Sequence, residues 1–87
     1  MKQKILNQIN DFVNLCYTAF AISAGDFAKE NFQNLVENIW DEKKTDNENL
    51  KEVKDLFELN RHLNEKAGNP FAAKTIATFQ EGWLNKI

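Results

Sequence analysis

Apolar residues recur at helical spacing along nearly the whole chain, and this regularity limits the possible folds more than any other feature. In the first segment Ile5, Ile9, Phe12 and Cys16 lie three or four residues apart, which places them on one face of a helix. The alternation of apolar and polar residues that marks a half-buried strand is absent from the sequence. The pattern therefore predicts an all-α protein, with helices over residues 2–21, 24–43, 48–67 and 70–87.

Helix start signals separate these segments. Ser23, with Asp26 three residues later, is the carboxylate variant of a capping box and predicts the start of the second helix. Thr45 with Glu48, or Asn47 alone, can cap the third helix. The stretch "KKTDNEN" is therefore predicted to be a capped turn between two helices.

Glycine and proline mark the remaining turns. In "AGNP", Gly68 can adopt the left-handed conformation that ends a helix, and Pro70 cannot continue that helix. Asn69 suits the N-cap of a fourth helix and Pro70 its first position, N1. Gly25 lies in the first turn of the second helix, where it would allow another backbone to approach closely.

Four amphipathic helices joined by short turns favour one particular architecture. Eighty-seven residues, 43% of them hydrophobic, are enough for one domain with one modest core. Short connections place consecutive helices side by side in opposite directions. We expect a single domain over residues 1–87, a compact antiparallel four-helix bundle, with a long helical hairpin that dimerises as the alternative.

The helical periodicity also predicts which side chains are buried. The first helix is expected to bury Ile5, Ile9, Phe12, Val13, Cys16 and Phe20. The third is expected to bury Leu50, Val53, Leu56, Phe57 and Leu63. Trp40 continues the row of Phe32 and Val36, so it either closes the core or presents an aromatic contact to a partner.

The sequence offers little for catalysis or for a cofactor. One cysteine excludes an internal disulfide, and one histidine with one cysteine lacks the spacing of a zinc site. The three glycines are scattered, so no phosphate-binding loop is present. His62 is the only imidazole, and helical geometry surrounds it with carboxylates on an exposed face. We therefore predict a protein that is not an enzyme and that needs no metal or cofactor.

Charge and hydropathy narrow the possible partners. A net charge of −2 argues against direct binding to nucleic acid, which usually requires a basic face. No stretch is long and apolar enough to cross a membrane, and polar residues interrupt what would be the core of a signal peptide. We expect a cytoplasmic protein that does not bind membranes.

Acidic residues are concentrated in the middle of the chain, and one leucine lies among them. On a helical wheel Leu59 falls outside the predicted core face, beside Glu48, Glu52 and Asp55, which suits a contact anchor within an acidic patch. Two plainer interpretations remain open: single exposed leucines are common, and carboxylates that alternate with lysines are typical of a solvated helix face. The candidate partner-binding residues are Asp41, Glu42, Asp46, Glu48, Glu52, Asp55, Glu58 and Leu59.

Several of these stretches resemble one known family. The segment "FVNLCYTAFAISAGDFAKENFQNLVENIW" contains the turn I-S-x-x-D-F between two helices, and "LKEVKDLFELNRHL", a proline turn and "FQEGWLNKI" follow it. This layout is similar to the immunity proteins of the colicin D type, including those that protect against contact-dependent-inhibition toxins. In this chain the stretch before the proline turn, "EKAGNP", is nearly neutral where the family is strongly acidic. The contact residues above therefore come from the charge pattern and not from the resemblance.

The resemblance implies a bacterial protein that binds its cognate toxin domain, typically a basic ribonuclease that cleaves tRNA, and covers its active site. A phage-encoded inhibitor of a nucleic-acid-processing enzyme, such as an anti-CRISPR protein, is an alternative that predicts the same acidic surface. A self-associating helical structural protein is the third hypothesis. For the first two we expect a monomer.

Overall fold

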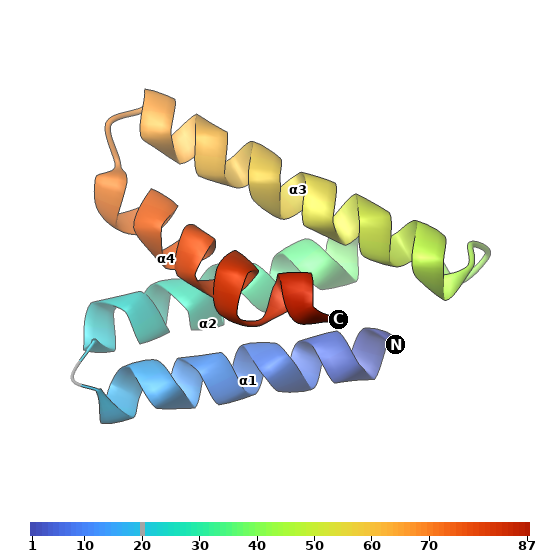
Figure 1. Ribbon diagram of the computed structural model, residues 1–87, viewed down its shortest axis with the longest axis horizontal. Helices are drawn as coiled ribbons and strands as arrows, with labels where there is room; N and C mark the ends of the chain where they lie inside the picture. The colour runs from blue at the N-terminus through green and yellow to red at the C-terminus, as the bar shows by residue number, and fades with distance from the viewer. Residues whose placement is uncertain (20) are drawn as a thin grey trace.

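Four α-helices in antiparallel order form most of the part of the chain that the computed structural model describes, residues 1–19 and 21–87. The helices are α1 (Lys2–Thr18), α2 (Ile22–Ile39), α3 (Asp46–Lys66) and α4 (Pro70–Gly82), followed by the short 3-10 turn η1 (Leu84–Lys86). Figure 1 shows that consecutive helices run in opposite directions and that both termini lie at the same end. The prediction of an all-α four-helix bundle is confirmed.

Each helix contributes one phenylalanine to the centre of the core. Phe32 of α2 lies 5.1 Å, between ring centroids, from both Phe57 of α3 and Phe79 of α4. Phe12 of α1 meets Phe79 edge to face at 5.3 Å. Aromatic pairs favour such tilted and edge-to-face geometries. These four buried rings connect all the helices and so pack the α1–α2 hairpin against the α3–α4 hairpin.

The corner between α1 and α2 differs from its prediction. Helix α2 begins at Ile22, so Ser23 already lies inside the helix, and Ala21 at the N-cap provides no side-chain cap. No capping box forms, because Ser23 is not the N-cap residue, and Asp26 Oδ1 instead accepts a hydrogen bond of 2.8 Å from the Tyr17 hydroxyl. The predicted burial of Phe20 lies outside the described residues.

Gly25 is needed at this corner, but not for the predicted reason. A Cβ atom at Gly25 would lie 2.7 Å from Cε1 of Tyr17, so the close approach involves an aromatic side chain and not another backbone. The hydrogen bond to Asp26 raises the pKa of Tyr17 above its ordinary value. Tyr17 therefore holds the corner through its ring and its hydroxyl, although it is partly exposed.

The turn between α3 and α4 follows its sequence signals. Gly68 has a positive φ of 75°, and Asn69 N–H donates to the Asn64 carbonyl at 2.8 Å while Gly68 N–H donates to the Glu65 carbonyl at 3.2 Å. This pair of hydrogen bonds is the Schellman motif. Pro70 occupies the first turn of α4, as predicted, while Asn69 makes no side-chain cap. The α-helix ends at Gly82 and not at residue 87, and the 3-10 turn that follows buries Leu84.

Leu63 was predicted to be buried, and this prediction is wrong. Its exposed fraction is 54%, and the buried row of α3 instead runs through Asn49, Val53 and Phe57. Asn64 continues this row, and Leu63 lies about 100° away from it around the helix. Figure 1 also shows α3 rising away from α2 towards its C-terminal end.

Candidate functional site

The loop between α2 and α3 carries the first of the candidate acidic residues, and one buried amide fixes its shape. Asn49, in the second turn of α3, is 1% exposed. Its Oδ1 accepts from the Asp41 backbone N–H at 2.9 Å, and its Nδ2 donates to the Asp41 carbonyl at 2.8 Å. The amide thus satisfies both backbone groups of Asp41, which explains why α2 ends at Ile39 and not at residue 43 as predicted.

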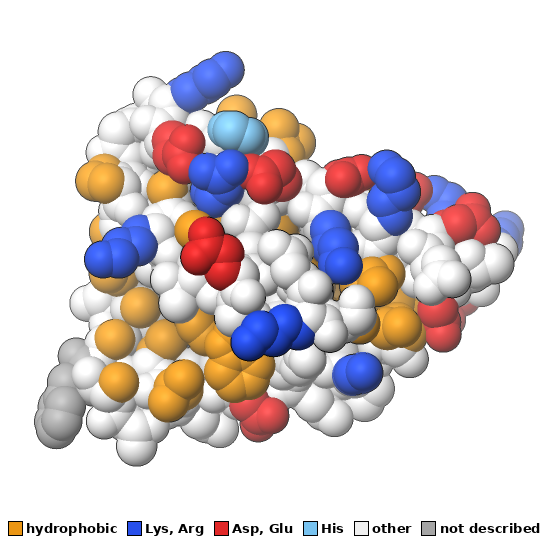
Figure 2. All heavy atoms as spheres, viewed as in Figure 1, with side chains coloured by type: hydrophobic (Ala, Val, Ile, Leu, Met, Phe, Trp, Pro, Cys, Tyr) orange, Lys and Arg blue, Asp and Glu red, His pale blue; other side chains and the backbone are white. Residues whose placement is uncertain are grey.

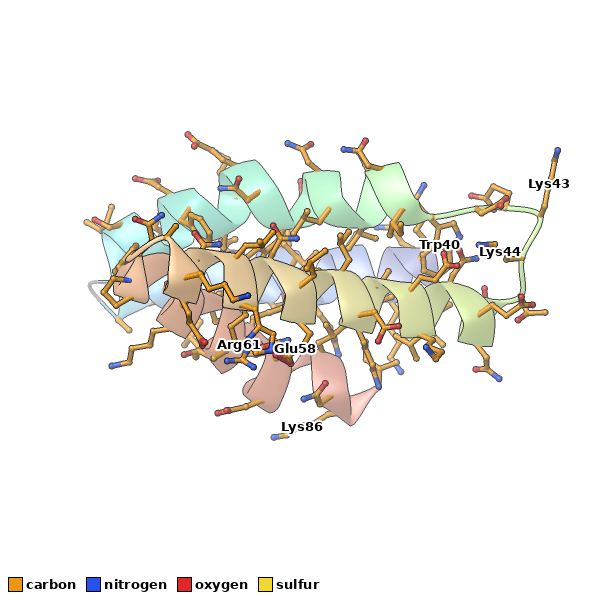
Figure 3. All side chains as sticks on the ribbon, turned by 90° about the horizontal axis from the view of Figure 1, so that it is seen from above. Trp40, Lys43, Lys44, Glu58, Arg61 and Lys86 are labelled. Carbon is orange, nitrogen blue, oxygen red and sulfur yellow. The ribbon has the colours of Figure 1, made fainter. Side chains whose placement is uncertain are left out.

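Trp40 and the tip of this loop point in different directions. Trp40 is half-buried and packs against the hydrophobic core, which agrees with the core-closing interpretation. In Figure 3 Lys43 extends away from the bundle, whereas Trp40 lies over it. The Asp41 carboxylate accepts from the Lys43 backbone N–H at 2.9 Å and so tightens the turn. The loop is therefore held at its base by Trp40 and Asn49, and its exposed charged residues are Glu42, Lys43 and Lys44.

The start of α3 is held by the predicted capping box. The Thr45 hydroxyl accepts from the Glu48 backbone N–H at 3.2 Å, and the Glu48 carboxylate accepts from the Thr45 N–H at 3.3 Å. Asp46 and Glu48 also lie in the first turn, where their negative charge interacts favourably with the positive end of the helix dipole. These two acids stabilise the helix in addition to any role at a surface.

Three of the candidate carboxylates form ion pairs within the chain. Glu52 accepts from Lys44 at 2.5 Å, and this hydrogen bond raises the pKa of Lys44. Asp55 pairs with Lys51 at 2.9 Å, and Glu58 pairs with Arg61. Exposed ion pairs of this kind contribute little stability and exchange readily, so these acids remain able to meet a partner's cations.

Asp41 and Glu42 lie in the loop before α3, and Asp46 lies about 200° around the helix from Glu48. The structure divides the remaining candidate residues between two sides of α3. One side carries Glu48, Glu52, Asp55, Leu59 and Leu63, which we call the α3 stripe. Glu58 lies instead on the α4 side, where it approaches Gln80 at 3.5 Å and contacts Arg61 (Figure 3). His62 is exposed beside it, with Nε2 3.3 Å from Glu58.

The α3 stripe changes in character along the helix. Its N-terminal half is acidic, and its C-terminal half exposes two leucines one turn apart, Leu59 at 53% and Leu63 at 54%. From Asp46 to Leu59 the helix extends about 20 Å, so the candidate residues are spread along α3 and do not form one compact patch. Figure 2 shows acidic and basic side chains alternating along the edge of the molecule that α3 occupies.

The negative charge of the protein is concentrated in the α2–α3 loop and the first half of α3. Residues 41–58 contain seven acidic and four basic side chains, a net charge of −3, against −2 for the whole chain. The remainder is slightly basic. The surface around the α2–α3 loop and the first half of α3 is therefore where a basic partner would be attracted most strongly.

Sequence reasoning missed two contributors to this region. Asn49 was not identified, although an asparagine in a core-facing position four residues after a predicted N-cap is a signal that could have revealed it. Leu63 was assigned to the core, but it is exposed and lies one turn beyond Leu59, so it extends the apolar end of the α3 stripe.

The chain was also compared with known proteins. A scan against protein-family models and searches of curated proteins and of solved structures each gave no match. In the described residues, no helix is long and apolar enough to span a membrane. The same residues contain no group of three or more potential metal-ligating His, Cys, Asp or Glu side chains.

Proposed function

We propose that this protein is an inhibitor of the immunity-protein class, which binds a bacterial toxin domain in the cytoplasm and covers its basic active site with the α3 stripe. The observation that carries the proposal is Leu59, an exposed apolar side chain flanked by Glu52 and Asp55 on a helix whose start is firmly fixed. The resemblance to colicin D-type immunity proteins supports the same class of partner.

The chemistry of a nuclease suits this surface. A ribonuclease presents lysines and arginines to the phosphates of its substrate. Carboxylates spaced along one side of α3 can meet those cations in place of phosphates, and complementary charge accelerates association. Leu59 and Leu63 would then be the desolvated anchors that slow dissociation. A rigid helix also loses little conformational entropy when it binds.

The experiment compares the affinity of the wild-type protein and of two charge-reversed variants for the same partner. The wild-type protein is used to isolate its partner from the native host, and the affinity of the purified partner is then measured by calorimetry. Glu52→Lys with Asp55→Lys should weaken binding at least tenfold and should weaken protection against the toxin in a growth assay. The control, Glu30→Lys with Glu37→Lys, reverses two exposed acids of α2 and should bind nearly as the wild type.

Unchanged affinity in the α3 variant, with its helical content intact, would contradict the proposal. The identity of the captured partner decides between a toxin and the target of a phage-encoded inhibitor. Gene order gives a second criterion, because an immunity gene normally lies directly downstream of its toxin gene. Sedimentation decides the remaining alternative: exposed Leu59 and Leu63 also suit self-association, which would give a dimer at low micromolar concentration.

A further inference from the structure

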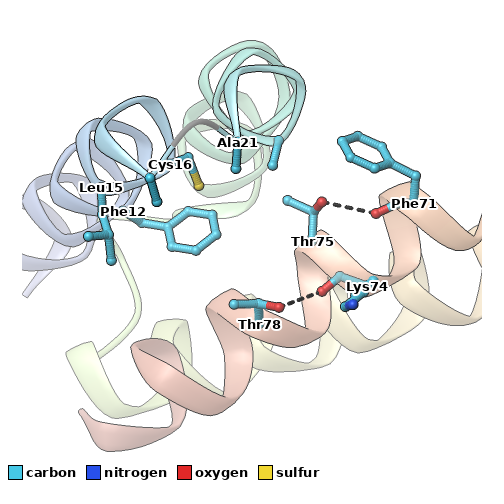
Figure 4. A pocket seen from close by; sticks show the side chains of 10 residues that line it. Phe12, Leu15, Cys16, Ala21, Phe71, Lys74, Thr75 and Thr78 are labelled. Atoms are coloured by element: carbon cyan, nitrogen blue, oxygen red, sulfur yellow. Dashed lines mark hydrogen bonds between the residues drawn. The ribbon is translucent and has the colours of Figure 1, made fainter.

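An apolar groove lies far from the α2–α3 loop, where the corner of α1 and α2 faces α4. Its volume is about 380 Å³, near the lower end of the range typical of small-ligand sites. Figure 4 shows its two walls: Phe12, Leu15, Cys16 and Ala21 on one side, and Phe71 and Thr75 of α4 on the other. Leu15 and Phe71 remain more than half exposed at its edges.

The threonines of α4 make this wall more apolar than the sequence indicates. The Thr75 hydroxyl donates to the Phe71 carbonyl at 2.9 Å, and the Thr78 hydroxyl donates to the Lys74 carbonyl at 2.8 Å (Figure 4). Both hydroxyls are thus satisfied within their own helix, so a ligand need not replace these hydrogen bonds. The groove can accept an apolar group without leaving these polar atoms unpaired.

Lys74 is the single charged side chain among the described residues that line the groove. No acidic side chain lies among them, and within the described part of the chain Lys74 forms no ion pair. An ammonium group at the edge of an apolar groove selects a ligand with one negative end and one apolar end. The charge at the groove is positive and that of the α3 stripe is negative, so we expect the groove to bind a different kind of partner.

We propose that this groove binds a small amphiphilic monocarboxylate, with an unbranched tail of about eight to ten carbons against Phe12, Cys16 and Thr75 and its carboxylate on Lys74. The tail supplies most of the affinity, because each methylene group that leaves water tightens Kd about fourfold. The ion pair with Lys74 supplies the preference for a carboxylate over an uncharged or cationic head group. This site is independent of the proposed function of the α3 stripe.

The test is a titration of the ¹⁵N-labelled protein with decanoate, kept below its micelle-forming concentration and followed by amide NMR shifts. We expect saturable shifts at Cys16, Ala24, Thr75 and Thr78, and Kd values that fall steadily from hexanoate to octanoate to decanoate. Decyltrimethylammonium should bind more weakly than decanoate. Lys74→Gln should weaken decanoate binding about twofold to fivefold and leave decanol binding unchanged.

Two further variants complete the design. Lys86→Gln removes an exposed lysine outside the groove and should bind decanoate as the wild type does. Thr78→Glu places a carboxylate at an exposed position of the groove wall and should weaken decanoate binding without unfolding the protein. Non-saturable or scattered shifts, or equal binding of the cationic amphiphile, would overturn the proposal. So would groove shifts that depend on protein concentration without ligand, because they would assign the groove to a second copy of the chain.

Discussion

At the scale of single residues, Asn49 fixes the loop that carries the first acidic residues of the candidate surface. Its side chain replaces the helical hydrogen bonds that α2 would need to continue past Trp40, and it fixes the backbone of Asp41 against α3. A buried amide is worth its desolvation only when its donors and acceptors are satisfied, and here Asp41 satisfies both ends. The acidic loop is consequently an ordered extension of α3.

Replacing Asn49 should therefore destabilise the protein. Asn49→Ala leaves the part-buried N–H of Asp41 without its partner and removes one of the hydrogen bonds that the Asp41 carbonyl accepts, while the Lys44 N–H still donates to that carbonyl at 3.0 Å. We expect the variant to lower the free energy of unfolding by about 1–2 kcal/mol. In a domain of this size that loss corresponds to a fall in Tm of about 4–16 °C, measurable by circular dichroism. The control is Asn47→Ala, an exposed neighbour in the same turn, which should change stability by less than about 0.5 kcal/mol. Equal effects of the two variants would contradict the role given to Asn49.

At the scale of elements, the signals at the two ends of α3 were read correctly, whereas the start of α2 and the exposure of Leu63 were not. The Thr45–Glu48 capping box and the Gly68–Pro70 turn were predicted because each depends on residues no more than five positions apart. Ser23 and Asp26 have the spacing of a capping box, but α2 begins at Ile22 and Asp26 instead accepts from Tyr17 of α1, a contact that the periodicity of α2 does not contain. Leu63 is exposed because it lies about 100° away from the buried row of α3.

The capping box gives a prediction for α3 as a whole. Thr45→Ala removes the oxygen that accepts from the Glu48 N–H, and we expect a loss of about 1 kcal/mol in the free energy of unfolding. Thr45→Ser keeps that oxygen and should remain close to the wild type. Chemical denaturation of the three proteins measures both effects. A Thr45→Ser variant as unstable as Thr45→Ala would show that the hydroxyl is not what matters at this position.

At the scale of the whole molecule, two different surfaces, the α3 stripe and the groove beside Lys74, lie around one core of four phenylalanines. The acidic and apolar α3 stripe lies on one hairpin, and the groove beside Lys74 lies where the two hairpins face each other. The acidic half of the stripe was predicted from sequence, because charge and helical phase are local properties. The groove was not, because its two walls come from segments at least 47 residues apart in the chain.

The most direct test of the central claim is an NMR footprint of the partner. The ¹⁵N-labelled protein is titrated with the unlabelled partner that the wild-type bait isolates, and amide shifts are mapped onto the structure. If the α3 stripe is the binding surface, the largest shifts fall on Glu48, Glu52, Asp55 and Leu59, and the groove amides around Thr75 change little. Shifts that are confined to the groove, or to the outer face of α1, would contradict the claim.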